Sequence, residues 1–508
     1  MTEKNARIRP RPLLPLWLAV VLAAASGGLM RLSFPAPAVW VLVFPALALL
    51  FVALIGRRVG GALLVGLIYG VVFFALLVAW TARYLGPIPW SALSALEAML
   101  TAIALIPIAL AYRWIPRALP RARTIVLPLV VGALWTGQEI FLGSWPYGGF
   151  PWARLGMTQS ESPLAPVASW TGVSGLSFVM VVCVALVIEL VRDRAWRRPL
   201  RIAAPVVLIA AMLLLPQFPT AASGEMRIGA VQGNGPTGYF DERKEYAVID
   251  AQLEATAPLV DDDLDLVVWP EGSVDYDPFQ DAATARMLTR VVNRIGAPLL
   301  LDAATQRGDD IFNTSMLWTA EGTADQLHDK RHPVPFGEYV PDRAFYNAIA
   351  PDLIGLLQRE YTPGANPPLM KVGDVRIGLA ICFDVIYDEV LREGVAGGAQ
   401  LLVFQTNNAD FRGTDENLQQ LAFARMRAIE AGRSVVNIST VGTSQIIRPD
   451  GSTQSSLNAD EAGALRDDVA LRSGLTAGIL LGPWIQQLLL WGGLATLAVS
   501  GLRTRRRR

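Results

Sequence analysis

The first 220 residues consist largely of long apolar runs, and one more run lies near the C-terminus. A helix needs about 20 mostly apolar residues to cross a membrane. The first run follows basic residues, as a signal peptide does, but further runs follow at once, so we interpret it as a retained helix. The pattern predicts eight membrane-spanning helices, at 13–30, 37–56, 61–82, 90–112, 124–142, 166–191, 201–218 and 475–502.

Arginine is concentrated in alternate loops between these runs. The loops after the second, fourth, sixth and eighth runs are rich in arginine, whereas the intervening loops carry only Arg31, Arg83 and Arg154. Basic loops of membrane proteins stay in the cytoplasm. With eight spans, all arginine-rich loops and both termini fall on the cytoplasmic side of the inner membrane.

Between residues 219 and 473, short strands alternate with helices. Strands of mixed direction with helices on the outer faces predict a layered α/β sandwich. Strands are expected at 226–232, 264–269, 297–302, 314–319, 324–329, 375–381, 400–405 and 434–439, and helices at 241–256, 281–295, 388–394 and 415–431.

The chain is therefore expected to be a multi-domain membrane protein. Residues 1–218 form a transmembrane domain of seven helices, 219–473 form an extracytoplasmic domain, and 474–508 form the eighth helix with a basic cytoplasmic tail. The hydrophobic fraction of 52% and the mean hydropathy of +0.38 exceed those of an ordinary soluble enzyme. The formal net charge of zero gives no indication of a nucleic-acid partner.

Candidate chemistry lies at three strand ends of the extracytoplasmic domain. Cys382 ends the strand at 375–381, Glu271 follows the strand at 264–269, and Lys330 follows the strand at 324–329. A thiol attacks only as a thiolate and needs a base beside it. Taken singly, each residue has an ordinary structural interpretation, but neighbouring strand ends bring all three over one pocket. Glu271 is then the proton acceptor, and Lys330 stabilises an oxyanion.

The residues around these positions form three short motifs. They are Trp-Pro-Glu at 269–271, Pro-Phe-Gly-Glu-Tyr-Val-Pro at 335–341, and Ile-Cys-Phe-Asp at 381–384. They resemble the three signatures of the nitrilase superfamily. With the eight spans and the Gly-Phe-Pro-Trp loop at 149–152, the whole chain resembles the apolipoprotein N-acyltransferase family.

The resemblance implies an αββα nitrilase-like sandwich and a Glu-Lys-Cys triad of Glu271, Lys330 and Cys382. It also implies a second essential acid at Glu338. Phe383-Asp384 stand where the family has Tyr-Glu, so these two supporting positions depart from the pattern.

The resemblance further implies the substrates. The acyl donor is a membrane phospholipid, and the acceptor is the α-amine of a diacylglyceryl-cysteine lipoprotein. The acyl chain is carried as a thioester in a ping-pong reaction without metal or other cofactor. We expect the enzyme to act as a monomer.

Two segments are candidates for contact with lipid. Trp152 lies in an aromatic loop and is expected at a lipid entrance, although such aromatics also serve as interfacial anchors. The apolar run at 344–357 includes Phe345, Ile354 and Leu357, and it is expected to be a mobile lid over the thioester. An ordinary packed helix is the alternative.

Two other functions fit part of the pattern. A membrane-anchored nitrilase-like amidase would use the same triad, but eight spans exceed what an anchor needs. A transporter or scaffold with an inactive enzyme-like domain would not require all three triad residues.

Overall fold

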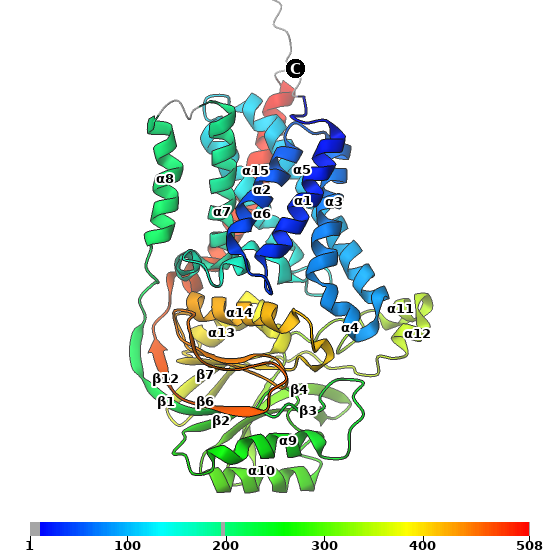
Figure 1. Ribbon diagram of the computed structural model, residues 1–508, viewed down its shortest axis with the longest axis vertical. Coiled ribbons are helices and arrows are strands. Elements are labelled where there is room, and N and C mark those ends of the chain that lie inside the picture. The colour runs from blue at the N-terminus through cyan, green and yellow to red at the C-terminus, as the bar shows by residue number, and fades with distance from the viewer. Residues whose placement is uncertain (1–10, 195–198, 507–508) are drawn as a thin grey trace, which may run out of the picture.

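The computed structural model describes residues 11–194 and 199–506 (Figure 1). It has a helical bundle at one end and a sandwich of two β-sheets at the other, with helices between them. Some basic residues that support the predicted orientation lie outside the described residues. These are Lys4, Arg7, Arg9, Arg197, Arg198, Arg507 and Arg508.

A helix occupies each of the eight predicted apolar runs. Among the described residues, six helices are long and apolar enough to cross a membrane, while the apolar helices Trp40–Leu54 and Pro205–Leu214 are shorter. The predicted multi-span character is confirmed, and eight crossings stay a prediction. The bundle consists of α1 (Leu16–Ser33), α2 (Val43–Leu54), α3 (Val59–Leu77), α4 (Ala82–Leu85), α5 (Pro87–Ala118), α6 (Arg123–Leu142), α7 (Ala168–Arg192), α8 (Pro199–Leu214) and α15 (Ala477–Arg506).

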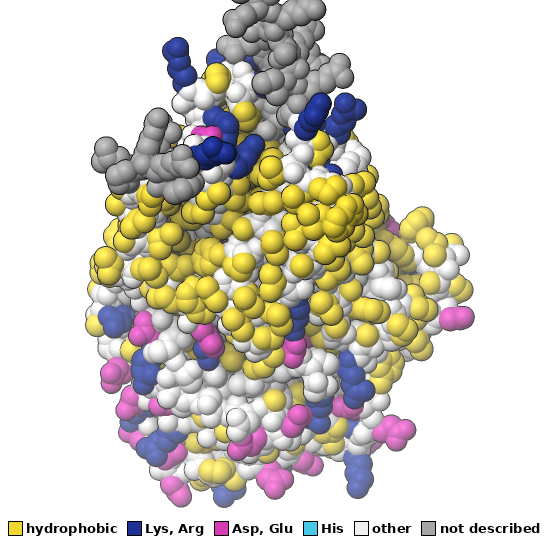
Figure 2. Space-filling model, turned by 45° about the horizontal axis from the view of Figure 1, so that its top comes forward, with side chains coloured by type: hydrophobic (Ala, Val, Ile, Leu, Met, Phe, Trp, Pro, Cys, Tyr) yellow, Lys and Arg dark blue, Asp and Glu magenta, His cyan; other side chains and the backbone are white. Residues whose placement is uncertain are grey.

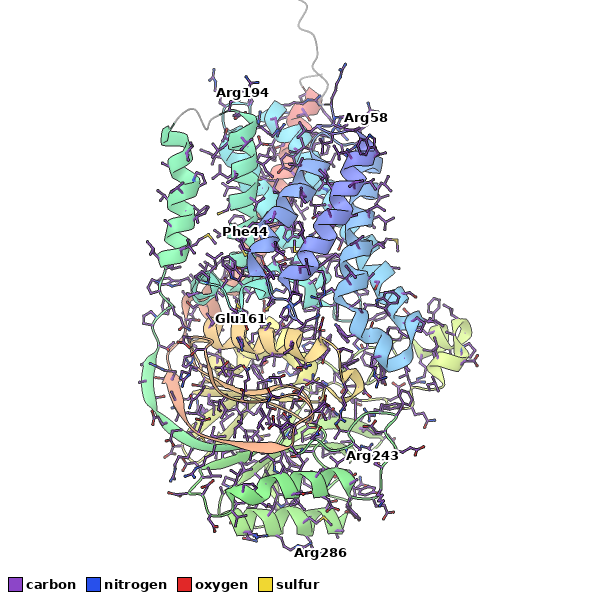
Figure 3. The ribbon with its side chains drawn as sticks, viewed as in Figure 1. Phe44, Arg58, Glu161, Arg194, Arg243 and Arg286 are labelled. Atoms are coloured by element: carbon purple, nitrogen blue, oxygen red, sulfur yellow. The ribbon has the colours of Figure 1, made fainter. Side chains whose placement is uncertain are left out.

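Apolar side chains cover the bundle on the face shown in Figure 2, and arginines lie beyond them. Large apolar residues of the bundle, such as Trp17 and Leu488, are exposed. Arg58 and Arg194 lie at the end of the bundle away from the sandwich (Figure 3). The last turn of α15 is also basic, with Arg503, Arg505 and Arg506.

The sandwich consists of two six-stranded sheets whose inner faces form a shared apolar core. Ile228 and Leu266 of one sheet, for example, belong to the same buried cluster as Val403 and Val436 of the other. The strand orders are β12-β1-β2-β3-β4-β5 and β11-β10-β9-β8-β7-β6. The first sheet consists of β1 (Ala221–Gln232), β2 (Leu266–Val268), β3 (Leu299–Arg307), β4 (Asp310–Trp318), β5 (Ala324–Asp329) and β12 (Gly463–Ser473). The second consists of β6 (Leu369–Val372), β7 (Val375–Ile381), β8 (Leu401–Thr406), β9 (Val435–Ser439), β10 (Ser444–Ile447) and β11 (Thr453–Leu457).

Helices cover both outer faces, so the predicted αββα sandwich is confirmed. The helices α9 (Ala247–Thr256) and α10 (Ala282–Ile295) lie on the side away from the bundle. The helices α13 (Asp388–Ala396) and α14 (Glu416–Ala431) lie between the second sheet and the bundle (Figure 1).

Two local predictions in the sandwich are corrected. The helix expected from residue 241 begins only at Ala247, where the Asp275 carboxylate accepts the free N–H groups of Val248 and Ile249 at 3.1 Å. A cap from a distant segment therefore sets this helix start. No strand is predicted at 463–473, yet β12 pairs with β1 along its length and leads the chain back to α15.

A buried ionic network joins the sandwich to the bundle. Arg427 of α14 donates to Asp388 and to Glu430, both at 2.7 Å. Asp388 also pairs with Arg154 of the loop after α6 at 2.5 Å, and it accepts a hydrogen bond from Gln486 of α15 at 2.6 Å. Arg427 is fully buried, and so the network fixes how the two halves dock.

We expect Arg427→Met to lower the free energy of unfolding by about 3 to 5 kcal/mol, because the buried Glu430 and the partly buried Asp388 lose their shared guanidinium. Thermal unfolding of the purified protein in detergent measures the loss. Arg425→Met on the same helix is the matched control, since its partner Glu161 is largely exposed. The control should lose about 1 kcal/mol or less, and equal losses for the two variants would contradict the role given to the network.

Candidate active site

The three predicted strand ends meet between the two sheets. The expectation of neighbouring strands is wrong, because β2 and β5 are separated by two strands and β7 belongs to the other sheet. Glu271 follows β2 and Lys330 follows β5, both in the first sheet, whereas Cys382 follows β7 in the second. Gln405 of β8 ties the sheets together beneath them. Its amide donates to the Trp269 carbonyl at 2.7 Å and accepts a hydrogen bond from Ser315.

Lys330 lies at the centre of the site and is only 1% exposed. Its ammonium is 2.9 Å from Oε1 of Glu271 and 2.8 Å from Oε1 of Glu338. The Asn313 amide donates to the same two oxygens, at 2.8 Å and 3.2 Å. Two carboxylates therefore share one ammonium and one amide, which fixes their positions.

The segments behind these carboxylates are also hydrogen-bonded. The Glu338 carboxylate accepts the backbone N–H of Val334 at 2.7 Å, which closes the loop after Lys330. Asp302 of β3 is fully buried and accepts the N–H of Gly272 at 2.7 Å, directly after Glu271. Burial, together with the nearby Glu271 charge, raises the pKa of Asp302 well above its usual value.

Cys382 is half-buried and begins the tight turn Cys382–Ile386. Its φ of 50° lies in the left-handed region, which a side chain other than glycine rarely adopts. Such backbone strain is typical of functional positions and turns this thiol out of the line of β7. The carbonyls of Val385 and Ile386 in the same turn accept hydrogen bonds from Arg427, at 2.9 Å and 2.8 Å.

The electrostatic setting keeps Lys330 charged and the thiol protonated. Burial works against the Lys330 charge, but Glu271 and Glu338 outweigh it and raise its pKa well above the usual value. Burial and the Glu271 carboxylate raise the pKa of Cys382, while Lys330 opposes them. The thiol therefore needs a proton acceptor before it can attack, and Glu271 is near enough to interact with it.

The two supporting residues after Cys382 lie on opposite sides of the turn. Asp384 is fully buried and accepts the backbone N–H groups of Arg331 and His332, at 3.1 Å and 2.8 Å. It thus ties the turn that begins at Cys382 to the chain that follows Lys330. The ring of Phe383 stacks instead on Phe150 of the membrane part, at 6.2 Å between ring centres.

The entrance and lid candidates occupy different settings. Trp152 is only 1% exposed, donates to Gln419 at 2.6 Å, and stacks beside Phe383 rather than lying at the surface. Ile354 and Leu357 are buried in a small cluster near α4, whereas Phe345 is 60% exposed. These three residues belong to an arm formed by α11 (Arg343–Ile349), α12 (Pro351–Ile354) and the turn after them.

Three further polar residues join the site without having been predicted. They are Asn313, Asp302 and Gln420, whose amide N–H lies 3.4 Å from the Cys382 sulfur. The sequence signal that could have identified them is a polar side chain on an otherwise buried face of a strand or helix. Within the described residues, no three His, Cys, Asp or Glu side chains are grouped so as to hold a metal ion.

Two protein-family models match this chain. The apolipoprotein N-acyltransferase N-terminal domain matches residues 26–186, and the carbon-nitrogen hydrolase domain matches residues 227–473. The apolipoprotein N-acyltransferase of Mycolicibacterium smegmatis is 31% identical, over 96% of this chain and 86% of that protein. The apolipoprotein N-acyltransferase of Azotobacter vinelandii is 31% identical, over 97% and 96%. Among solved structures, a mutant of the Nesterenkonia AN1 amidase from the nitrilase superfamily is 19% identical, covers 49% of this chain and 92% of its own, and has a TM-score of 0.38.

We expect Glu271→Gln to lower the pKa of Cys382, because it removes a negative charge that opposes the thiolate. Lys330→Met should raise the pKa of Cys382, because this substitution removes a favourable positive charge. Each substitution should shift the pKa by about 1 to 3. The rate of Cys382 alkylation by iodoacetamide, followed by peptide mass spectrometry over a pH series, measures both. Glu393→Gln is the control, since Glu393 pairs with Arg331 at the surface. A Glu271→Gln profile that matches the wild type would contradict the assigned electrostatics.

Proposed function

This chain belongs to the apolipoprotein N-acyltransferase family and is a multi-pass membrane acyltransferase, and we propose that it carries its acyl chain on Cys382. The donor is a membrane phospholipid, and the acceptor is the α-amine of a diacylglyceryl-cysteine lipoprotein. The observation that carries the proposal is Lys330, buried between Glu271 and Glu338 beside that thiol.

In the first half-reaction, Glu271 takes the proton of the Cys382 thiol, and the sulfur attacks the phospholipid ester carbonyl. Lys330 and the backbone N–H of Phe383 stabilise the resulting oxyanion. The C–O bond then breaks, a thioester remains, and the lysophospholipid leaves with the proton that Glu271 returns. Glu338 and Asn313 keep Lys330 and Glu271 in place during these proton transfers.

In the second half-reaction, the lipoprotein amine attacks the thioester carbonyl. Glu271 accepts a proton from the attacking nitrogen, the C–S bond breaks, and the proton passes to the Cys382 thiolate. The products are an amide and the free thiol, so the enzyme returns to its starting state. An amide is more stable than a thioester, and for this reason no external energy source or cofactor is needed. All three triad residues come from one chain, which supports a monomeric enzyme.

We further propose eight membrane crossings, both termini in the cytoplasm, and an extracytoplasmic catalytic domain. The charge distribution supports this orientation. Arg58 and Arg194 lie at the bundle end away from the sandwich (Figure 3), and the last turn of α15 is basic. Basic residues mark the cytoplasmic side of a membrane protein. The active site then lies where the outer-leaflet phospholipid and an exported lipoprotein meet.

The α11–α12 arm is proposed as a lid that contacts the membrane surface. It projects beside α4 at the level where the bundle meets the sandwich (Figure 1). Phe345, Ile349 and Leu356 are large apolar residues exposed on the arm, while Ile354 and Leu357 pack toward Tyr84 and Leu85 of α4. An apolar outer face on a small projecting arm suits a segment that dips into the lipid headgroups. Trp152 is part of the aromatic stack that supports Phe383.

A small-molecule amidase would use the same triad, but the comparisons favour the acyltransferase. Relatives across nearly the full chain are apolipoprotein N-acyltransferases. The family's N-terminal domain model matches the bundle, and the carbon-nitrogen hydrolase model matches the catalytic domain.

Incubation with phospholipid alone should leave one acyl group on Cys382, because no amine is present to resolve the thioester. Intact-protein and peptide mass spectrometry would find the added mass, and hydroxylamine should release it. Cys382→Ser should give no hydroxylamine-sensitive adduct, while Cys183→Ser should behave as the wild type because Cys183 is buried in α7. An acyl group on any residue other than Cys382 would refute the proposed carrier.

The arm is tested by substitutions that separate its exposed and buried faces. Phe345→Ser should slow acyl transfer from vesicles by roughly tenfold, with little change in thermal stability, because it removes an exposed side chain that contacts lipid. Ile354→Ser should mainly lower stability, because Ile354 is 5% exposed within its cluster. Ser substitution of Leu357 is expected to resemble that of Ile354. A Phe345→Ser enzyme with wild-type transfer rates would favour an ordinary packed helix over a lid.

A further inference from the structure

A chain of buried hydrogen bonds ends on the Cys382 sulfur from the side of α14. The backbone N–H of Gly442 donates to Ser439 Oγ at 2.8 Å, and Ser439 Oγ donates to Asn408 Oδ1 at 2.6 Å. Asn408 Nδ2 donates to Gln420 Oε1 at 2.9 Å, and Gln420 Nε2 donates to the sulfur at 3.4 Å. Ser439, Asn408 and Gln420 are each at least 96% buried.

The donor-to-acceptor direction of this hydrogen-bond series is set at the end farthest from the sulfur. A backbone N–H can only donate, and the Ser439 hydroxyl accepts two of them, from Gly442 at 2.8 Å and from Val441 at 3.4 Å. Both of its acceptor sites are then used, so it gives its own hydrogen to Asn408. The Asn408 oxygen is thereby an acceptor, and its NH₂ group faces Gln420. Asn408 uses its second N–H on Glu416 at 2.7 Å, which fixes the same orientation. The Gln420 oxygen must then accept, which leaves its NH₂ group toward the sulfur.

We propose that Gln420 is a further residue of the reaction, which stabilises the Cys382 thiolate by an amide N–H, and that Asn408 positions it. The proposal rests on the nucleophile assigned under the proposed function. A hydrogen bond to the charged form of a group favours that form. It is stronger for a thiolate than for the neutral sulfur of a thioester, so it favours both the attacking and the departing sulfur.

The other charged groups around the thiol show why such a donor is useful. Glu271, Glu338 and Glu416 oppose the thiolate, and Lys330 favours it. Lys330 is already shared between two carboxylates. A neutral donor on the opposite side stabilises the negative sulfur without adding a charge that would hold the proton of Glu271.

Gln420→Met keeps an unbranched side chain of similar size and removes the donor. In a Cys183→Ser background, where Cys382 is the only thiol, it should raise the pKa seen in the alkylation profile by about 1 to 2. It should slow acyl-enzyme formation roughly 10- to 100-fold, as expected for a lost hydrogen bond to a charged group. Gln419→Met is the matched control, because this neighbouring buried amide bonds to Trp152 and Leu77 instead. The control should leave the thiol pKa unchanged even where it lowers thermal stability.

Asn408→Leu tests the positioning role without altering the group at the sulfur. Asn408 also donates to Glu416, whose charge opposes the thiolate, so every variant of this cycle carries Glu416→Gln. In that background the effect of Asn408→Leu on the thiol pKa should resemble that of Gln420→Met. It should disappear in the double variant, because Asn408 then acts through Gln420 alone. Additive effects would refute the positioning role, and an unchanged alkylation profile in Gln420→Met would refute the proposal as a whole. The alkylation profile needs no acyl transfer. A wild type that forms no acyl-enzyme would therefore overturn the proposed function, while the profiles would still decide the role of Gln420.

Discussion

The site depends on one buried ammonium, that of Lys330. Burying a cation away from water costs free energy unless carboxylates and hydrogen bonds replace the water. Here carboxylate oxygens of Glu271 and Glu338 lie within 2.9 Å of the ammonium. Each carboxylate also accepts a second hydrogen bond. Glu271 accepts one from the Asn313 amide, and Glu338 accepts one from the backbone N–H of Val334. The lysine stabilises the two carboxylates as well, because without its positive charge they would repel each other. Glu271, Lys330 and the loop after Lys330, which are the proposed base, oxyanion donor and their support, are thus fixed together. The thiol has only to be brought to them from the other sheet.

The other sheet brings the thiol through contacts that begin in the membrane part. The turn that starts at Cys382 is held by Arg427, whose guanidinium is also the centre of the network that docks the sandwich on the bundle. Asp384 then ties this turn to the chain after Lys330. The position of the sulfur relative to the base therefore depends on the junction as well as on the sandwich. This dependence gives the bundle a role in the chemistry that a simple anchor would not have.

The sequence predicts the parts of this arrangement that follow from local periodicity. Apolar runs locate the membrane helices, and alternating runs locate the strands whose ends carry Glu271, Lys330 and Cys382. Periodicity says nothing about which side chains from distant segments meet. Asn313 and Gln420 become recognisable only when β4 and α14 are placed beside the triad, and the start of α9 depends on Asp275 from another segment. In β12, Arg466, Asp467 and Asp468 interrupt the apolar alternation, so the pairing with β1 has no clear local signal. The burial of Trp152 likewise comes from docking, since an aromatic residue in a membrane loop is ordinarily an interfacial anchor.

One helix, α14, serves the junction and the nucleophile at once. Its C-terminal half carries Arg427 and Glu430 into the ionic network, and its N-terminal half carries Gln420 to the sulfur and Gln419 to Trp152. A tilt of the sandwich on the bundle would move this helix and with it the N–H on the thiol. Lipid access by opening the junction would therefore disrupt the site that the lipid has to reach. The α11–α12 arm carries none of the triad, and it is held by a small apolar cluster together with contacts to Tyr147 and Tyr239. The proposed function therefore assigns the opening for the acyl chain to the arm and the fixed geometry to the junction.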